Sequence, residues 1–133
     1  MGTVVALAAQ FGGAKLADGL YRLRGKDLAV VVNTGDDYEH LRLPLSPDLD
    51  TLLYTLAGIS SASGWEPQGE TRALQGMLKL LGGPDRPALG DKSLATALLR
   101  AEGLANERRL TEITQDFCRA LGVAARLLPM CDE

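Results

Sequence analysis

The sequence predicts a Rossmann-like α/β fold, with a parallel sheet, helices on both faces and a helical insertion between the second and third strands. Two short apolar runs, 3–9 and 28–33, flank a glycine turn and a segment with helical spacing. Strand, glycine turn, helix and strand in this order open a doubly wound parallel sheet. A third apolar run, 125–130, follows a long helical stretch and predicts the third strand.

Periodicity and capping residues place the helices. Leu16, Leu20 and Leu23 recur at helical spacing after the glycine turn. Ser46 and Pro47 match an N-cap followed by a proline in the first turn, which predicts the start of a helix. The predicted helices are 14–23, 47–57, 70–81, 91–105 and 111–121, and the main loops are 34–47, with a short extended piece at 41–45, and 59–69.

Length and composition fit a single α/β domain over 1–133. Hydrophobic residues make up 46% of the chain, so disorder is not expected, and the net charge of −3 comes without a block of Lys and Arg, which argues against nucleic acid as a partner. The apolar run 4–9 is too short for a membrane span. Cys118 and Cys131 have no metal-type spacing. We therefore expect a cytoplasmic protein with neither a nucleic acid nor a membrane as partner.

The most informative residues are carboxylates that follow the second predicted strand. Asp36 and Asp37 come after Val-Val-Val-Asn-Thr-Gly, where open α/β sheets bind ligands, and Asp48 and Asp50 lie near the next helix start. Carboxylates from two loops are ligands for a hard cation such as Mg²⁺. The alternatives are a Gly-Asp turn for the first pair and a favourable helix dipole for the second. Asp48 and Asp50 share a side if extended and diverge if helical, so we expect one of them to meet Asp37.

The glycine turn after the first strand is a candidate phosphate site. Gly12 and Gly13 precede a helix whose N-terminal N–H groups attract anions, and Lys15 lies in its first turn. The sequence has no Gly-x-Gly-x-x-Gly fingerprint, so a tight turn with a solvated Lys15 explains the same residues.

Of five further residues, three have both a functional and a structural interpretation. His40 is a general-base candidate or a solvated loop histidine. Trp65 either stacks on an aromatic ligand or covers the helical region. Asp91 either binds a ligand or caps its helix, and Asp132 follows the last strand at the carboxyl edge of the sheet. Cys118 lies on an apolar helix face, which indicates a core position.

Motifs along the whole chain resemble the 2-phospho-L-lactate transferase (CofD) family. The two most specific are Asn33-Thr34-Gly35-Asp36-Asp37 and Ser46-Pro47-Asp48-Leu49-Asp50-Thr51. The resemblance covers only the N-terminal half or less of a typical member, so we expect a truncated fold with an unpaired edge after its last strand. The other matching motifs are Gly12-Gly13-Ala14-Lys15-Leu16, Tyr54-Thr55-Leu56-Ala57-Gly58, Gly64-Trp65, Leu89-Gly90-Asp91 and Leu127-Leu128-Pro129-Met130.

The resemblance implies a transferase of deazaflavin coenzyme (coenzyme F-420) biosynthesis. Such enzymes move a phospholactyl-type group from a guanosine diphosphate-linked donor to the hydroxyl of a deazaflavin riboside, releasing GMP, with Mg²⁺. By this resemblance Asp37, Asp48 and Asp50 hold the metal, Asp37 and Asp50 are catalytic, and the protein is a homodimer. The residues implied in nucleotide or deazaflavin binding are Gly12, Gly13, Lys15, Asn33, Thr34, Gly35 and Asp91.

Departures from the family pattern favour an alternative function. Ala9 and Gln10 stand where the family usually has glycines, beside the bulky Phe11, and side chains there would keep a phosphate from the backbone. Lys92 and Ser93 replace the family's Arg-Asp after Leu-Gly-Asp. The alternative is a truncated or degenerate, non-catalytic module that binds a nucleotide or a deazaflavin. A third hypothesis is a subunit that only completes the sheet of another chain.

Overall fold

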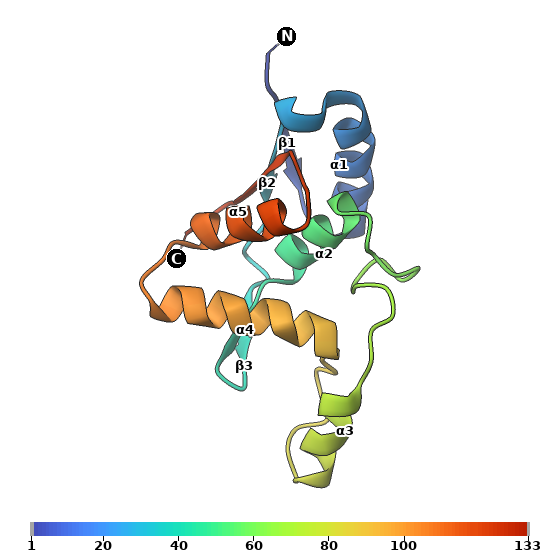
Figure 1. Ribbon diagram of the computed structural model, residues 1–133, viewed down its shortest axis with the longest axis vertical. Coiled ribbons are helices and arrows are strands. Elements are labelled where there is room, and N and C mark those ends of the chain that lie inside the picture. Colours follow the sequence, from blue (N-terminus) through green and yellow to red (C-terminus); the bar gives the residue numbers. More distant parts are fainter. Residues whose placement is uncertain (1, 133) are drawn as a thin grey trace.

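A parallel sheet of three short strands organises the molecule (Figure 1). The computed structural model describes residues 2–132. Its sheet has the order β1 (Val4–Ala8), β2 (Leu28–Val32) and β5 (Arg126–Pro129), and both pairs of neighbours are parallel. The three predicted strands, the parallel sheet and the α/β class are therefore confirmed.

Two helices cover one face of this sheet. α1 (Gln10–Arg24) packs on β1 and β2, and α2 (Pro47–Leu56) lies against α1 and reaches β2 and β5. The short 3₁₀ turn η1 (Gly25–Asp27) joins α1 to β2. Burying apolar side chains between the helices and this face supplies most of the driving force for folding. The core includes Ala6, Ala8, Ala14, Ala17, Leu28, Val30, Val32, Leu49, Leu52, Leu53 and Leu127.

A third helix, α5 (Leu110–Ala120), runs along the outer edge of β5. The Gln115 side-chain amide donates a 2.6 Å hydrogen bond to the carbonyl of Leu127. The backbone N–H of Met130 turns the other way and donates to the Val32 carbonyl of β2 (2.8 Å). The edge that we expected to be unpaired is thus covered by α5, because a helix side chain takes the place of a neighbouring strand.

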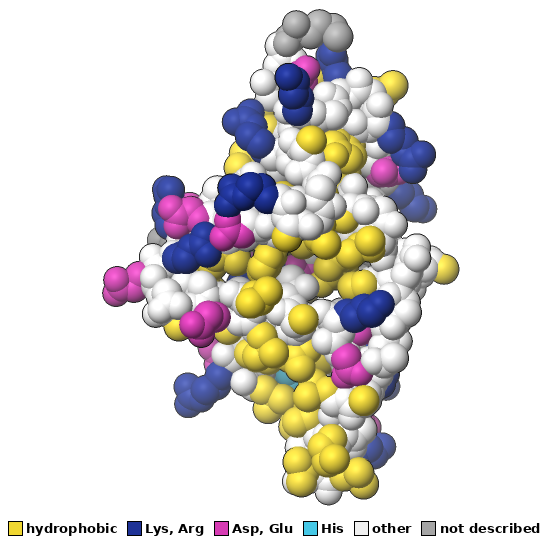
Figure 2. All heavy atoms as spheres, in the orientation of Figure 1, with side chains coloured by type: hydrophobic (Ala, Val, Ile, Leu, Met, Phe, Trp, Pro, Cys, Tyr) yellow, Lys and Arg dark blue, Asp and Glu magenta, His cyan; other side chains and the backbone are white. Residues whose placement is uncertain are grey.

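The stretch between β2 and β5 is mostly helical, as predicted. α3 (Ala73–Leu80) and α4 (Asp91–Ala105) lie here, between α2 and α5 in the chain. α3 stands at the end of the molecule far from the sheet (Figure 1), where hydrophobic side chains gather on the surface (Figure 2). The exposed apolar residues of this end are Met77, Leu80 and Leu81. No helix within residues 2–132 is both long and apolar enough to cross a membrane.

A small antiparallel hairpin follows the acidic loop. Its strands are β3 (Tyr38–His40) and β4 (Leu43–Leu45), whereas the sequence predicts only an extended piece at 41–45. The connecting residues, Leu41 and Arg42, both have positive φ, 51° and 61°. Two-residue hairpin loops of type I′ need this conformation at both positions, and Asn-Gly usually supplies it. Leu-Arg gives no such signal, which is why the hairpin is not evident in the sequence.

The helix α1 begins directly after β1, four residues before the predicted start. Gln10 has φ 51°, in the left-handed region that favours glycine, and this conformation turns the chain from strand to helix. A Cβ on Gly13 would lie 2.9 Å from the Ala8 Cα, so Gly13 allows α1 to pack closely on β1. The predicted glycine turn is therefore the first turn of the helix.

The second face of the sheet differs from the first. Side chains alternate along β1, so that Ala6 and Ala8 are buried while Val5 and Leu7 are 62% and 78% exposed. No helix of the described residues covers Val5 and Leu7, although we expected helices on both faces.

Candidate functional site

The carboxyl end of β2 brings two acidic segments together. Asn33 follows the strand, and its Nδ2 donates hydrogen bonds of 2.9 Å to Asp36 Oδ2 and to Asp48 Oδ2. Its Oδ1 accepts a bond from the Gly35 N–H (3.0 Å), which closes the turn. Asp36 is exposed, whereas Asp48 is buried in the first turn of α2. One asparagine side chain thus ties the loop after β2 to the start of α2.

Asp37 has a carboxylate oxygen without a partner. The Ser46 hydroxyl donates a 2.7 Å hydrogen bond to Asp37 Oδ2, and the Asp37 N–H donates to the Thr34 carbonyl (3.1 Å). Asp37 Oδ1 is buried and has no hydrogen-bond partner in the described part of the chain. Burial raises the pKa of Asp37, against the lowering effects of Ser46 and Arg100. Because buried polar atoms are nearly always paired, this oxygen is the main candidate in the loop for contact with a ligand, a metal ion or a water molecule.

Asp50 is two residues from Asp48 in α2, but its partner comes from another element. Both of its carboxylate oxygens accept hydrogen bonds from the Arg100 guanidinium of α4, and Arg100 also donates to the Pro44 carbonyl (3.3 Å). The side chains of Asp48 and Asp50 therefore meet different elements, as we expected for a helical segment. Burial raises the pKa of Asp50, and the charge of Arg100 opposes this shift.

Arg100 is the main site residue that the sequence analysis misses. Its side chain is 3% exposed, so its charge is almost fully enclosed with that of Asp50. The available signal is its place on the buried side of α4, three residues after the fully buried Ala97. A charged residue on an apolar helix face is seldom buried without a partner.

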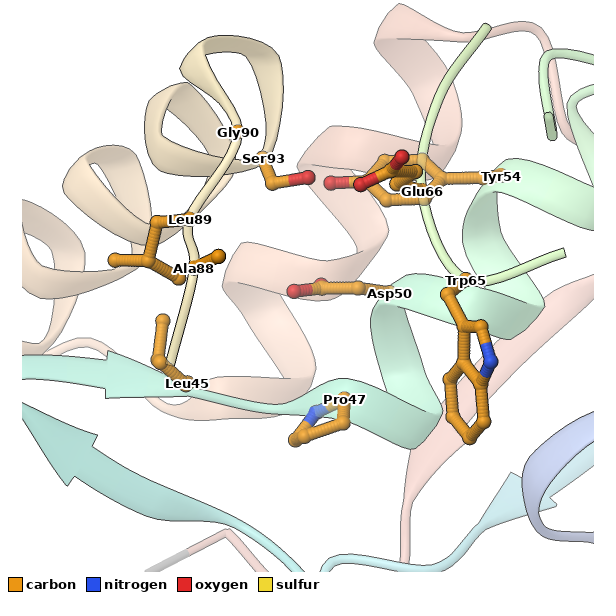
Figure 3. A pocket seen from close by; sticks show the side chains of 10 residues that line it. All are labelled: Leu45, Pro47, Asp50, Tyr54, Trp65, Glu66, Ala88, Leu89, Gly90 and Ser93. Carbon is orange, nitrogen blue, oxygen red and sulfur yellow. The ribbon is translucent and has the colours of Figure 1, made fainter. Parts of the chain in front are cut away.

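A pocket of about 170 Å³ lies beside Asp50 (Figure 3). Tyr54 on α2 shares a 2.8 Å hydrogen bond with the Thr96 hydroxyl. Trp65 packs edge-on against Phe11 of α1, with ring centroids 3.8 Å apart. The pocket combines aromatic and aliphatic walls with a few polar groups, and its size suits a small, partly polar ligand or one end of a larger ligand. The lining residues are Leu45, Pro47, Asp50, Tyr54, Trp65, Glu66, Ala88, Leu89, Gly90 and Ser93.

Another pair of carboxylates, Glu70 and Asp91, has a structural task. Glu70 accepts hydrogen bonds from the backbone N–H groups of Lys92 (2.6 Å) and Ser93 (3.0 Å), which caps α4. Asp91 accepts one from the backbone N–H of Leu74 (2.9 Å), which caps α3. Each carboxylate therefore caps the other's helix, and we call these two residues the capping pair. Asp91, a ligand residue by resemblance, caps α3 and not the helix that it begins.

The pKa values of the capping pair shift in the opposite direction to the pKa of Asp37. The Thr71 hydroxyl and backbone N–H groups lower the pKa of Asp91. Partial burial works against the shift at Glu70, but hydrogen bonds from the Ser93 side chain and from the backbone lower its pKa as well. Gly90 has no room for a side chain, since a Cβ there would lie 2.0 Å from the Glu70 carboxyl carbon.

Two predicted phosphate-site residues remain at the surface. Gly12 is exposed, with open space where a Cβ would stand, and Lys15 is exposed on the first turns of α1. His40 lies on β3, half-buried, and its Nε2 is buried without a hydrogen-bond partner among the described residues.

Two residues near the end of the described chain have structural surroundings. Asp132 accepts hydrogen bonds from the Thr111 backbone N–H (2.8 Å) and hydroxyl (2.6 Å), so it caps α5. Cys118 is buried, and burial raises the pKa of its thiol to about 11. The prediction that Cys118 is a core residue is confirmed.

The edge site, which we define as Asn33, Asp37, Ser46, Asp48 and Asp50, offers oxygen ligands from two elements. Within residues 2–132 no group of three or more Asp, Glu, His or Cys side chains is arranged to hold a metal ion by itself. The ion pair of Asp50 with Arg100 leaves Asp37 and Asp48 as the two carboxylates without a paired cation. Mg²⁺ is commonly bound through one or two carboxylates, with water and substrate phosphates as the other ligands. The donor set fits Mg²⁺ in that mode.

Fold and site together define a Rossmann-like α/β protein with an oxygen-rich site at the carboxyl edge of its parallel sheet. The chain belongs to the CofD family, since the family model described as "2-phospho-L-lactate transferase CofD" matches residues 4–133.

Curated relatives agree with this assignment. The chain is 39% identical to a protein of Kitasatospora aureofaciens named phosphoenolpyruvate transferase, over 98% of this chain and 42% of the relative. A phosphoenolpyruvate transferase of Streptomyces avermitilis is also 39% identical, over the same shares. A 2-phospho-L-lactate transferase of Methanospirillum hungatei is 36% identical, over 92% of this chain and 42% of the relative. The chain thus spans about two fifths of the length of these relatives, and it corresponds to their N-terminal portion.

Proposed function

We propose that this chain forms the metal- and nucleotide-binding part of a CofD-type transferase in coenzyme F-420 biosynthesis. The reaction moves a phosphorylated three-carbon acid from a guanosine diphosphate-linked donor to the hydroxyl of a deazaflavin riboside. The acceptor oxygen forms a bond to the phosphorus that carries the acid, the bond from that phosphorus to the oxygen of GMP breaks, and GMP leaves. The names of the relatives support two choices of acid, phosphoenolpyruvate and 2-phospho-L-lactate.

The observation that carries this proposal is the buried, unpartnered Oδ1 of Asp37. Asp37 lies close enough to Asp48 for the charge of Asp48 to contribute to its raised pKa, and Asn33 fixes the position of Asp48. In the proposed enzyme Asp37 and Asp48 bind Mg²⁺, and Ser46 orients Asp37 through its hydroxyl. Mg²⁺, when bound, supplies neutralisation of the phosphate charge, which phosphoryl transfer needs more than it needs a nucleophilic side chain.

Part of the acceptor, the end that carries the attacking hydroxyl, is proposed to enter the pocket beside Asp50. Trp65 supplies an aromatic face for the deazaflavin ring, and Asp50 accepts a hydrogen bond from the hydroxyl that attacks. The raised pKa of Asp50 suits a group that receives the proton of that hydroxyl. In this assignment Arg100 does not touch the substrate, and it fixes the direction of the Asp50 carboxylate.

The conformation of Gln10 favours the second candidate, a non-catalytic binding module. Gln10 has φ 51° at the N-terminus of α1, where glycine would be favoured, and a side chain there narrows the approach of a phosphate to the helix N–H groups. Gly12, two residues later, has open space around it, so an approach to the helix remains. The two candidates therefore differ in turnover and not in the place of binding.

Release of GMP separates the two functions. The chain is incubated with deazaflavin riboside and with the guanosine diphosphate-linked donor of either acid, with and without Mg²⁺, and GMP is measured by chromatography. We expect GMP only with Mg²⁺, at least 10-fold less in Asp48→Ala, and no change in Asp85→Asn, whose exposed carboxylate pairs with Lys79 at the surface. Binding of the donor without GMP release supports the binding module, and absence of both contradicts both functions.

The homodimer and the cytoplasmic location stay predictions. Light scattering of the purified chain measures the first, and fractionation of cells that express it measures the second.

A further inference from the structure

The uncovered side of the parallel sheet is the strongest feature that the proposed function does not use. We call it the open face and define it as Val5, Leu7, Val31, Leu128 and Met130. Leu7, Val31 and Leu128 form one row across the three strands, because the register pairs them directly. The exposed fractions of Val5, Leu7 and Met130 are 62%, 78% and 59%.

A shallow hollow of about 290 Å³ lies at the carboxyl end of this face. Leu7, Val31 and Met130 line it together with Ala8, Ala9, Val32 and Asn33. Six of these seven side chains are apolar, so water gains few hydrogen bonds there and an apolar side chain would displace it favourably.

We propose that the open face is the docking surface for the part of the CofD fold that this chain does not span. All-parallel sheets occur almost only with both faces covered, and here one face has α1 and α2 while the other has no helix within residues 2–132. The chain spans 42% of its Kitasatospora relative, so more than half of that protein lies outside the match. That length is ample for a second layer of helices.

The open face fits this occupant better than a membrane or a second copy of the chain. Its charges argue against a membrane, and the way parallel sheets pack argues against a second copy. Arg126 is the one charged residue at a register position of this face, in the row of Val5 and Ala29. An anionic membrane surface needs a cluster of basic residues. A second copy would have to place one parallel sheet face against another, whereas parallel sheets are normally covered by helices.

The place of the hollow connects the occupant to the edge site. Asn33 lines the hollow and also donates the hydrogen bonds that hold Asp36 and Asp48. A segment that fills the hollow therefore also shields one side of Asn33 from water. Met130, close to the end of the described chain, lies at the same rim.

Cysteine labelling in two settings tests the docking surface without any measurement of activity, so its outcome is separate from that of the proposed function. Leu7→Cys is made in a Cys131→Ser background, because Cys131 is exposed while Cys118 is buried. The first setting is the chain itself. The second is a chimera in which the chain replaces the matched segment of the Kitasatospora relative. The matched control is Leu23→Cys on α1, which is 81% exposed and lies outside the open face.

We expect Leu7→Cys and Leu23→Cys to react with a maleimide at similar rates in the chain itself. In the chimera Leu7→Cys slows at least 10-fold while Leu23→Cys does not. Equal rates for Leu7→Cys in the two settings overturn the proposal. So does a chain that is already protected at Leu7→Cys and has the mass of a dimer by light scattering, which assigns the face to a second copy. Cys118 is buried in the core and should stay unreactive in both settings, which shows that the compared proteins are folded.

Discussion

Two groups of carboxylates in this chain show how the same residue types acquire opposite tasks. Glu70 and Asp91, the capping pair, accept hydrogen bonds from backbone N–H groups at helix starts, and their pKa values are lowered. Asp37 and Asp50, in the edge site, are more enclosed, and burial raises their pKa values. The first pair is fully used by the fold. In the second pair, Asp37 keeps a carboxylate oxygen that has no hydrogen-bond partner among the described residues.

The difference lies in the partners and not in the local sequence. Asp50 and Asp91 each lie in the first turn of a helix, where the dipole favours a negative charge, whereas Asp37 lies in the loop after β2. At the capping pair backbone N–H groups supply most of the hydrogen bonds to the carboxylates. At the edge site only side chains do so, namely those of Asn33, Ser46 and Arg100. An acidic residue is therefore the strongest site candidate where one of its oxygens is left without a partner.

The largest effect is expected from breaking the enclosed ion pair of the edge site. Arg100→Met leaves the Asp50 charge buried without its cation, which lowers the free energy of unfolding by about 3–5 kcal/mol. Denaturant unfolding followed by circular dichroism measures the change. The control is Arg22→Met, which removes an exposed i,i+4 pair with Asp18 and should change stability little. If Asp50→Leu combined with Arg100→Met does not recover stability relative to Arg100→Met, the loss does not come from the uncompensated charge.

A smaller gain in stability is expected from Asp37→Asn. Because the pKa of Asp37 is raised in the folded state, its ionised form costs stability once the pH exceeds the ordinary Asp value of 3.8, so removal of the charge stabilises the protein at pH 7. The effect is expected to be small, because the amide still has buried polar atoms to satisfy and only the charge is removed. Thermal unfolding at pH 7 checks the sign, and a lower melting temperature for Asp37→Asn would mean that its charge is stabilising.

The capping pair should respond to pH in the opposite sense. Both pKa values are lowered in the folded state, so the caps stabilise fully above the ordinary values of 3.8 for Asp91 and 4.5 for Glu70, and this is lost as the pH falls through the folded values. The protection factors of the α3 amides, which correct for the slower intrinsic exchange in acid, should therefore fall as the solution is acidified. Asp91→Asn should show the faster exchange already at pH 7, with the protection of β2 unchanged. Equal protection of α3 in Asp91→Asn and the parent would show that the cap contributes nothing there.

The smallest effect is expected outside both groups. Leu41→Asn places a residue that tolerates positive φ in the β3–β4 turn, which should stabilise the protein by about 0.5 kcal/mol. This variant is a control for the edge-site variants, because it changes the free energy of unfolding without altering a carboxylate. Chemical unfolding measures the gain, and a loss of stability would mean that the Leu41 side chain has packing that outweighs its backbone strain.

The sequence predicts the architecture well because its hydrophobic pattern reports burial. The continuous apolar run 28–33 reflects contact with the core, and this strand and the helix predicted at 91–105 are both found where they are predicted. The start of α1 is misplaced because Gly12 and Gly13 look like a turn, whereas Gly13 serves close packing on Ala8. The β3–β4 hairpin is missed because its turn, Leu41 and Arg42, lacks the residues that usually mark one.

The candidate site is predictable only in part. A strand that ends in Asn-Thr-Gly-Asp-Asp indicates where the carboxylates lie, since the carboxyl ends of parallel strands share one edge. Pairings between distant elements leave no such trace in the sequence. Arg100 is 50 positions from Asp50, and Glu70 is 23 positions from Ser93, so their contacts arise from the tertiary fold.

The central claim is that Asp37 and Asp48 share one Mg²⁺ ion with a guanosine diphosphate ligand. Calorimetric titration of Mg²⁺ into the chain with GDP present tests it directly, in the parent, in Asp37→Asn and in Asp85→Asn, whose exposed carboxylate lies outside both groups. We predict one binding event in the parent and in Asp85→Asn, and an affinity at least 10-fold lower in Asp37→Asn. Binding of Mg²⁺ to Asp37→Asn as tightly as to the parent would contradict the account.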